Sequence, residues 1–584
     1  MNILFVVLGV VAIFYVAYLT YGKFLATRVF KLDNSRKTPA VELEDGVDYV
    51  PTEPKFLLGQ HFSAIAAAGP ITGPILAGIM FGWVPALIWI VLGSIFVGGV
   101  HDMGALVASV RHKARSITEV VKINVSKRAW VLFMAFIWIT LVYVIVAFTD
   151  ITASSFVGII TLENGEKVGG GAIATSSLLY LALPVVMGLL LKYTKLNLTW
   201  ATIIFLPLVG VAIWVGKYIP FDLAAALGVD GSTAIKVWDV IILVYCLIAS
   251  VLPMWLLLQP RGHLGGYFMY AAILTAAIGV LFGGFKVQYP AFTKPMADAT
   301  QFFFPMFPLL FITVACGACS GFHSLVGSGT TSKQLKREGD AKIIGYGAML
   351  LEGIIAVVAL ACVMILTKDS ALLSKSPNFI YASGIGNFLA LLGVPAAFGI
   401  SFGLMAFTTF VYDTLDVCTR LGRYIIEELT GWRTLPGKLF STALTAGVPI
   451  LFVMRTALDA KGNPIPAWKV FWNTFGASNQ LLAGLALIGI TVWLFSAYRK
   501  SKVWLATFIP AVWMFVMSNW ALINLVRAGW FKDGFKLTSD PVPYVSVVLI
   551  VLSVLMVVET IAAMLRISKS GGASQPEAVP AVAQ

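Results

Sequence analysis

The sequence predicts an all-α polytopic membrane protein with about 15 transmembrane helices, at roughly twenty apolar residues per crossing. Three observations lead to this fold class. The composition is too apolar for a soluble chain of this length, long apolar runs alternate with short charged loops, and two of the runs are interrupted by glycine or proline in mid-span. The interrupted pair predicts an inverted repeat with two discontinuous helices.

Composition sets the class of protein. Of the 584 residues, 59% are hydrophobic and 12% are charged, and the mean hydropathy is +0.89. The net charge of +13 does not indicate nucleic-acid binding, because the basic residues lie in short loops between apolar runs, where they report membrane orientation. The five cysteines all fall in apolar runs, so no disulfide framework is expected.

The apolar runs define the crossings in order. We expect spans at 2–22, 57–80, 82–110, 128–158, 174–192, 198–216, 235–258, 266–285, 305–328, 342–366, 396–418, 439–455, 478–497, 501–521 and 541–563. With alternating crossings, most Lys and Arg residues fall on one side if the N-terminus is outside and the C-terminus is cytoplasmic. The run at 2–22 lacks a basic leader and a cleavage site, so we interpret it as a retained span. We expect one transmembrane domain over 1–565 and a disordered cytoplasmic tail over 566–584.

The glycine-rich run at 378–393 is apolar but does not fit as a crossing. Counting it would reverse every later loop and remove the charge asymmetry. We therefore expect this segment to lie on the outer face or dip into it as a re-entrant gate.

The two interrupted spans are the predicted substrate site. In span 57–80 the interruption falls in mid-span, and in span 305–328 glycines recur through the second half. Backbone groups freed at such breaks must be satisfied by protein, water or a bound solute, and half-helix N-termini favour anions. The residues expected to bind substrate are Gly69, Pro70, Ile71, Thr72, Gly73, Ser320, Gly321, His323 and Ser324.

Polar and ionisable residues inside apolar spans are candidates for ion or proton coupling. They are His101, Asp102, Asp150, Glu352, Thr408, Thr409 and Asp413, and His323 could also take up a proton. Structural alternatives remain open. His101 and Asp102 could form an interhelical hydrogen-bonded pair, His323 could be a satisfied packing residue, and Asp413 and Asp416 could pair with Arg420 or Arg423.

No metal, cofactor or catalytic site is expected. The spacing of Cys316, Cys319 and His323 superficially resembles that of metal ligands, but small-residue helix packing is favoured, because the sequence offers no fourth ligand. The chain has no Gly-rich ATP-binding loop, nucleophile elbow or His-Glu-x-x-His motif, so it is not expected to be an enzyme. Transport energy would then come from an ion gradient.

Four segments together resemble the bacterial carbon starvation protein A family. They are Gly69-Pro-Ile-Thr-Gly-Pro-Ile-Leu-Ala-Gly78, His101-Asp-Met-Gly104, Arg261-Gly-His-Leu-Gly-Gly-Tyr-Phe-Met-Tyr270 and Ala315-Cys-Gly-Ala-Cys-Ser-Gly-Phe-His-Ser-Leu-Val-Gly-Ser-Gly-Thr-Thr-Ser-Lys-Gln334. The resemblance extends to about residue 565.

The resemblance implies uptake of pyruvate or peptides across the bacterial inner membrane when preferred carbon is scarce, with proton coupling in the pyruvate carriers. It also implies kinship with the amino acid, polyamine and organocation superfamily. A 5+5 inverted-repeat core at about 57–497 would then carry peripheral helices at 2–22, 501–521 and 541–563. By the same analogy, Thr408 and Thr409 fall where sodium-coupled relatives place an ion ligand.

The sequence therefore predicts a secondary transporter that imports pyruvate or a similar small carboxylate by proton symport, through alternating access at mid-membrane. Sodium is the alternative coupling ion. A peptide transporter is the first rival, and a channel or nutrient sensor is a rival of another class. The expected partners are a small-molecule substrate and the lipid bilayer, with no nucleic acid, and the oligomeric state is left open.

Overall fold

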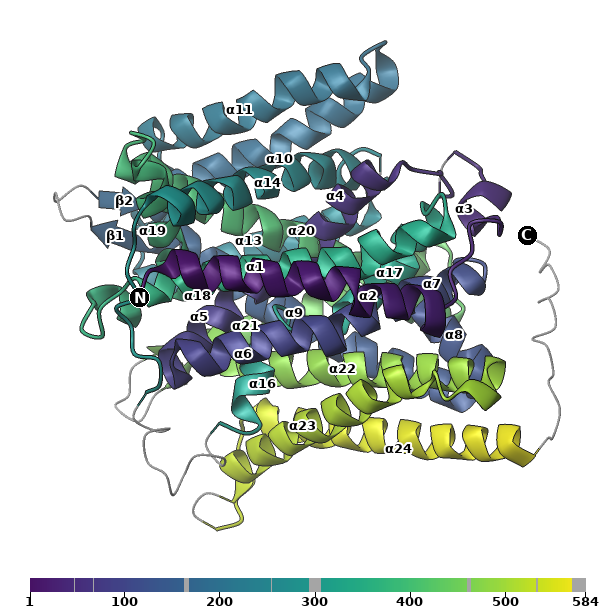
Figure 1. Cartoon of the computed structure of the whole chain (residues 1–584). Helices are drawn as coiled ribbons and strands as arrows, with labels where there is room; N and C mark the ends of the chain where they lie inside the picture. The colour runs from purple at the N-terminus through teal and green to yellow at the C-terminus, as the bar shows by residue number, and fades with distance from the viewer. Residues whose placement is uncertain are drawn as a thin grey trace.

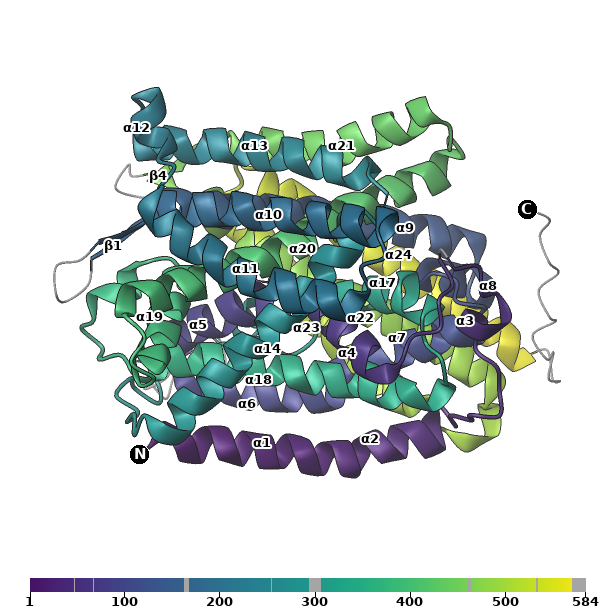
Figure 2. The same cartoon turned by 90° about the horizontal axis from the view of Figure 1, so that it is seen from above.

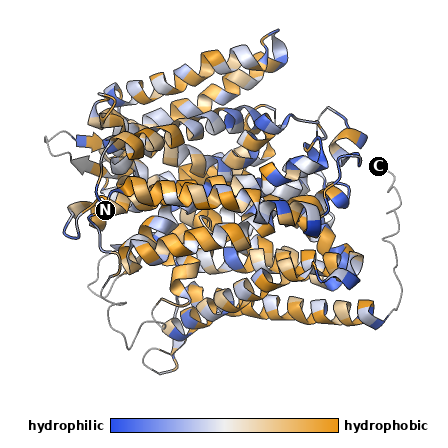
Figure 3. Ribbon diagram, in the orientation of Figure 1, coloured by the Kyte–Doolittle hydropathy of each residue, from blue (hydrophilic) through white to orange (hydrophobic). Residues whose placement is uncertain are grey.

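The computed structural model describes residues 1–46, 48–66, 68–161, 167–253, 255–293, 306–458, 464–531 and 534–569. Most helices lie along one common axis, as both views of the ribbon show (Figures 1 and 2). Apolar residues dominate the middle of this bundle and polar residues gather toward its two ends, which is the pattern of a membrane-spanning bundle (Figure 3). Helix α1 begins at one end of the bundle and α24 finishes at the other (Figure 1).

The helices fall in the following order. The first half contains α1 (Ile3–Leu19), α2 (Tyr21–Phe24), α3 (Pro39–Glu42), α4 (Pro54–Ile65), α5 (Gly69–Phe81), α6 (Trp83–Gly93), α7 (Gly99–Arg111), α8 (Ile117–Asn124), α9 (Lys127–Val157), α10 (Gly170–Tyr193), α11 (Leu198–Tyr218), α12 (Leu223–Leu227), α13 (Gly231–Val251) and α14 (Leu258–Phe282). The second half contains α16 (Leu309–Thr313), α17 (Phe322–Gly329), α18 (Ala348–Met364), α19 (Pro377–Ala390), α20 (Ala396–Thr430), α21 (Leu435–Val453), α22 (Ala467–Ala497), α23 (Leu505–Trp530) and α24 (Pro541–Lys569).

Short elements complete the described chain. Short π- or 3₁₀-helical turns are η1 (Leu25–Val29), η2 (Ser94–Gly98), η3 (Thr331–Lys333), η4 (Glu338–Asp340), η5 (Lys342–Gly347), η6 (Ala371–Ser374) and η7 (Arg499–Ser501). Two small antiparallel hairpins pair β1 (Ile159–Thr161) with β2 (Lys167–Gly169), and β3 (Ala457–Leu458) with β4 (Pro464–Ile465). These hairpins lie outside the bundle's core and do not change its all-α character.

The prediction of an all-α polytopic membrane protein is confirmed. Among the described residues, 13 helical segments are long and apolar enough to cross a membrane, and the bent pair α4 and α5 adds a fourteenth. The remaining predicted span, 305–328, corresponds to α16 and α17, which are separated by an unwound segment and are each too short to cross alone. The division into a 5+5 inverted repeat stays a prediction.

Several boundaries differ from those expected. Helix α14 begins at Leu258, whereas the predicted spans ended at 258 and resumed at 266, so the sequence had placed Arg261 in a connecting loop. Residues 566–569 belong to α24, so the predicted disordered tail begins too early, and 570–584 lie outside the described residues. The segment 378–393 forms most of α19, a 14-residue helix too short to cross a bilayer.

The interior of the bundle is made by α9, α18, α20 and α22, whose span residues are mostly buried. In helices α1, α11 and α24 fewer than a third of the span residues are buried, as expected for positions against lipid. Helix α19 packs against α14, α18 and α20 at the end of the bundle where α1 begins (Figure 1). The broken helices are therefore enclosed by continuous ones.

Candidate functional site: a buried ionisable chain beside two broken helices

The first break falls earlier than the sequence suggested. Helix α4 ends at Ile65 and α5 begins at Gly69, with a bend of 50° between them. Gly69, Pro70, Ile71, Thr72 and Gly73 are thus the first residues of the second half-helix. Proline is tolerated in a first helical turn, where its missing amide hydrogen has no intrahelical acceptor, so the Gly-Pro run starts α5 instead of unwinding it.

The second break is longer, and it falls where the glycines in the sequence predicted it. Residues 314–321 are not helical, and α17 resumes at Phe322. Ser320 and Gly321 lie in this unwound segment, while His323 and Ser324 form the first turn of α17. The Ser324 hydroxyl donates to the Gly321 carbonyl at 2.7 Å, which closes the end of the break.

The two breaks touch each other. A β-carbon at Gly69 would lie 2.3 Å from the Cys316 sulfur, and one at Gly73 would lie 2.5 Å from the Thr313 carbonyl oxygen. Any larger residue at either position would push the half-helices apart. The tertiary structure therefore brings the two interrupted spans, which carry the predicted substrate-binding residues, into contact.

Two amide side chains of α22 hold the unwound segment. The Phe322 amide donates to Asn479 Oδ1 at 3.1 Å, and the Gly321 amide donates to the Asn479 carbonyl at 3.0 Å. Asn479 Nδ2 donates to the Ser320 hydroxyl at 3.0 Å, and Gln480 Nε2 donates to the Phe311 carbonyl at 2.6 Å. Amides that were expected to receive a substrate carboxylate are thus bonded to protein in this conformation.

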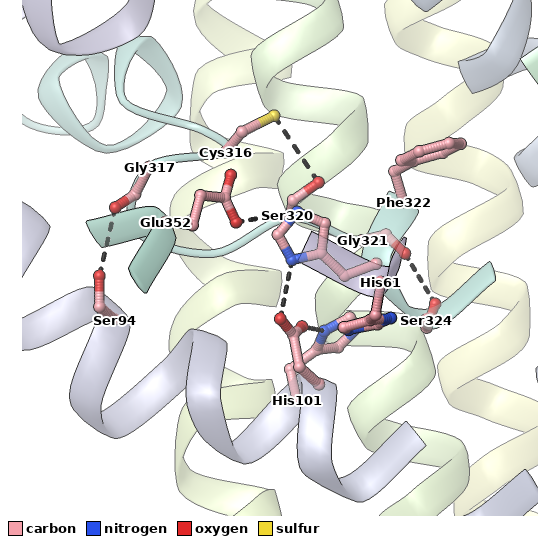
Figure 4. A network of polar contacts seen from close by, with 12 residues as sticks. His61, Ser94, His101, Cys316, Gly317, Ser320, Gly321, Phe322, Ser324 and Glu352 are labelled. Carbon is pink, nitrogen blue, oxygen red and sulfur yellow. Dashed lines mark hydrogen bonds and ion pairs between the residues drawn. The ribbon is translucent and has the colours of Figure 1, made fainter. Parts of the chain in front are cut away.

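Next to the second break lies a chain of four buried ionisable side chains (Figure 4). Asp102 on α7 accepts from His101 Nδ1 at 2.7 Å and from His323 Nδ1 at 2.8 Å. His323 Nε2 in turn lies 3.2 Å from Glu352 Oε2 on α18. All four side chains are at most 1% exposed.

This chain has the composition of a proton-binding site. Both imidazole Nδ1 atoms are bonded to Asp102, so His323 Nε2 is the nitrogen that faces Glu352 Oε2. These two atoms are close but are not aligned as a hydrogen bond. Glu352 Oε1 has no hydrogen-bond partner in the described part of the chain. A charge buried in this way costs several kcal/mol unless it is paired or protonated, so the chain favours binding a proton.

A second buried ion network surrounds Arg261 on α14. Its guanidinium donates to Asp413 Oδ1 at 2.5 Å, to the Tyr245 hydroxyl at 2.6 Å and to Asp416 at close range. Ser63 on α4 also donates to Asp413, at 3.1 Å. Asp413 and Asp416 are therefore ion-paired, which agrees with the structural alternative considered from the sequence, but the cation is Arg261.

Arg420 and Arg423, the cations considered from the sequence, are engaged elsewhere. Arg420 donates to the carbonyls of Ala249 and Leu252, and Arg423 lies 3.4 Å from Glu427. Both arginines follow the aspartates on the same helix and point to other neighbours.

The remaining predicted coupling residues lie apart from the ionisable chain. Asp150 accepts from the Trp468 amide at 2.8 Å and so caps the first turn of α22. The Thr408 hydroxyl lies 3.3 Å from that of Ser177 on α10. In the described residues, neither Thr408 nor Thr409 hydrogen bonds to the two broken helices.

The two cysteines of the second break, Cys316 and Cys319, are buried and free. Cys316 accepts from Asn479 Nδ2 at 3.5 Å and donates to the Ser320 hydroxyl at 3.7 Å. Over the described ranges, no group of three or more His, Cys, Asp or Glu side chains is arranged to hold a metal ion.

Sequence reasoning missed His61, Arg261, Asn479 and Gln480. The polar run Ser478-Asn479-Gln480 inside an apolar span was a readable signal, as was His61 just before the first break. Arg261 was hidden because the span boundary was placed after it.

Comparison with known proteins gives the family. The family model for carbon starvation protein CstA matches residues 1–381 and 368–521. The peptide transporter CstA of Escherichia coli K12 is 31% identical over 91% of this chain and 81% of its own length. The peptide transporter CstA of Bacillus subtilis 168 is 30% identical, over 96% and 97% respectively.

A third relative is named for a different substrate. The pyruvate/proton symporter BtsT of Escherichia coli K12 is 29% identical over 91% of this chain and 83% of its own length. Among solved structures, a mutant manganese transporter from Eremococcus coleocola aligns with 89% of this chain and 98% of its own, at 15% identity and a TM-score of 0.45. On the family match and the identity to its relatives, the chain belongs to the CstA family of carbon starvation proteins, which are membrane transporters.

Proposed function

We propose that this protein is a secondary active transporter that imports pyruvate or a similar small carboxylate together with protons across the bacterial inner membrane. The observation that carries the proposal is the buried chain His101, Asp102, His323 and Glu352 beside the two touching breaks. A proton bound there changes the charge next to the place where the half-helices meet. Substrate and proton binding would then be coupled through the same helices.

The mechanism we propose is alternating access. The half-helices α5 and α17 both begin at the breaks, so their N-terminal ends favour a substrate carboxylate. Protonation of the His323 and Glu352 pair adds positive charge or removes negative charge beside this site, which favours an anion. Release of that proton on the other side of the membrane would weaken anion binding and let the substrate leave.

Peptide uptake is the second candidate. Two relatives named above are peptide transporters, and one is a pyruvate/proton symporter. A cavity of about 660 Å³ between α4, α10 and α14 is far larger than pyruvate needs, which favours a peptide. A channel or nutrient sensor would not accumulate substrate against a gradient.

The test is uptake into proteoliposomes that contain the purified protein. Labelled pyruvate is added with and without an inward proton gradient, and dipeptides serve as competitors. We expect gradient-dependent accumulation of pyruvate that dipeptides do not reduce. Dipeptide accumulation without pyruvate uptake would support the peptide candidate, and equilibration without accumulation would indicate a channel.

Two variants test the coupling role. Glu352→Gln and His323→Gln should abolish gradient-driven accumulation, because neither retains the proton exchange between the two side chains. His112→Gln is the matched control, since His112 bonds to the Ala108 carbonyl and Asn124 near the end of α7, away from the breaks. Normal accumulation with unchanged pH dependence in both site variants would contradict the proposal.

A further inference from the structure

His61 on α4 is a buried histidine that the proposed coupling chain does not use. It is 2% exposed, and its Nδ1 lies 2.8 Å from the Thr331 hydroxyl. The Thr331 hydroxyl donates to the Val326 carbonyl at 3.4 Å, so it accepts from His61 and the proton of neutral His61 is on Nδ1. Nε2 is then a bare acceptor, and it has no hydrogen-bond partner in the described part of the chain.

The position of His61 joins the two buried ion networks. On one side, α4 packs against α17 and α18, the helices that carry His323 and Glu352, and Figure 4 draws His61 beside the ionisable chain. On the other side it lines a cavity of about 60 Å³ together with Arg261 and Asp413. Several polar side chains line this cavity, and it has room for a few water molecules, at about 10–15 Å³ each.

The small cavity continues toward the surface. Gln60, Gln259, Gly262 and Gln334 line both this cavity and the larger one of about 660 Å³. Among the residues that line the larger cavity, Lys55 and Lys192 are exposed. It lies where α4 begins and α10 ends, at the bundle end that the loop charges predict to be cytoplasmic.

We propose that His61 is the relay that carries the proton from the His323, Asp102 and Glu352 chain into these cavities and so to the cytoplasm. His61 takes up a proton at Nε2 and becomes the imidazolium; its Nδ1 proton then passes to the Thr331 hydroxyl, which turns its own proton from the Val326 carbonyl to the small cavity. One proton enters and one leaves. The ring is then neutral with its proton on Nε2, and tautomer exchange returns that proton to Nδ1 before the next cycle. Asp413, held by Arg261 and Ser63 on the cavity wall, is the next acceptor along this path.

This inference rests on the proposed proton coupling and adds the route by which the proton leaves. The groups that face His61 explain why the route runs in this direction. His323 and Glu352, with Asp102 bonded to His323, lie on the side where α4 packs against α17 and α18, while Arg261 and Asp413 line the small cavity on the other side. His61 thus lies between a site that loads a proton and a cavity with room for water molecules that can remove it.

The experiment compares net symport with exchange in the same proteoliposomes. Net symport is read from pyruvate-driven acidification of the lumen, with the pH-sensitive dye pyranine trapped inside. Exchange is read from the entry of labelled pyruvate into vesicles preloaded with unlabelled pyruvate at equal pH, which requires no net proton release. If the wild type carries dipeptides instead of pyruvate, both assays use a labelled dipeptide.

We expect His61→Gln to lose substrate-driven acidification while keeping exchange at the wild-type rate, and His112→Gln to keep both. Ala64→Val, which adds volume to the wall of the small cavity, should slow acidification more than exchange. Full acidification in His61→Gln, or loss of exchange together with acidification, would overturn the relay. Absence of acidification in the wild type would instead overturn the proposed proton coupling, and the relay with it.

Discussion

The Arg261 network allows a sharp test of how the bundle is stabilised. Replacing Arg261 by Met keeps much of the side-chain volume but removes the cation that Asp413 and Asp416 share. Arg261 is fully buried and both aspartates are at most 4% exposed, so bulk solvent does not reach the carboxylates that lose their cation. Removing one partner of a buried ion pair typically costs about 3–5 kcal/mol. Because two carboxylates lose their cation, we expect the loss of stability in Arg261→Met to fall in the upper part of that range.

Two further variants separate charge from packing. The triple variant Arg261→Met, Asp413→Asn and Asp416→Asn removes the uncompensated charges and should recover most of the lost stability. Arg420→Met is the matched control, because Arg420 is also buried but donates to two backbone carbonyls and forms no ion pair with a carboxylate in the described residues. Its loss leaves unsatisfied carbonyls, with an expected cost of about 1–3 kcal/mol.

The assay uses the protein's own cysteines. All five are buried and free, so a thiol-reactive fluorogenic dye reports unfolding in detergent as they become accessible. Equilibrium unfolding in mixed micelles gives the free energies. The reasoning would be refuted if Arg261→Met were as stable as Arg420→Met, or if the triple variant were no more stable than the single one.

Three other predictions concern helix contacts. Gly73→Ala should prevent accumulation of folded protein in the membrane, because the new β-carbon would lie 2.5 Å from the Thr313 carbonyl oxygen at the end of α16. Gly210→Ala is the control and should leave the amount of folded protein unchanged, because no atom lies within 4 Å of the position of its β-carbon. Asn479→Leu should lower stability by about 1–3 kcal/mol, measured by the same thiol assay, since it leaves a buried backbone amide unpaired. Glu338→Gln should lower the thermal midpoint at neutral pH, because Glu338 is buried and forms an ion pair with Arg111; an unchanged midpoint would show that the pair contributes nothing.

The sequence predicted the membrane class, the crossings and the two broken spans, because these depend on local composition. An apolar run of about twenty residues specifies a crossing wherever it occurs in the chain. Glycine and proline mark interruptions by their backbone chemistry alone. The exact place of the first break was harder to predict, since a proline can equally begin a helix or interrupt one.

The sequence also singled out most members of the ionisable chain, because a charged residue in an apolar run is conspicuous. It could not show that Asp102 bridges His101 and His323, or that His323 reaches Glu352, since these residues come from three helices. Asp150 looked equally suitable as a coupling residue from the sequence. In the structure it caps α22.

By itself, the sequence determined that the chain crosses the membrane many times, that two of its spans are interrupted, and that a few polar side chains lie inside apolar spans. Only the tertiary structure decided which of those polar groups meet. Arg261 satisfies the aspartates of α20 in place of the arginines nearer to them in sequence, and Asn479 holds the second break from across the bundle. The physical reason is that burial in a bilayer requires each polar group to find a partner, while the identity of that partner depends on how distant helices pack.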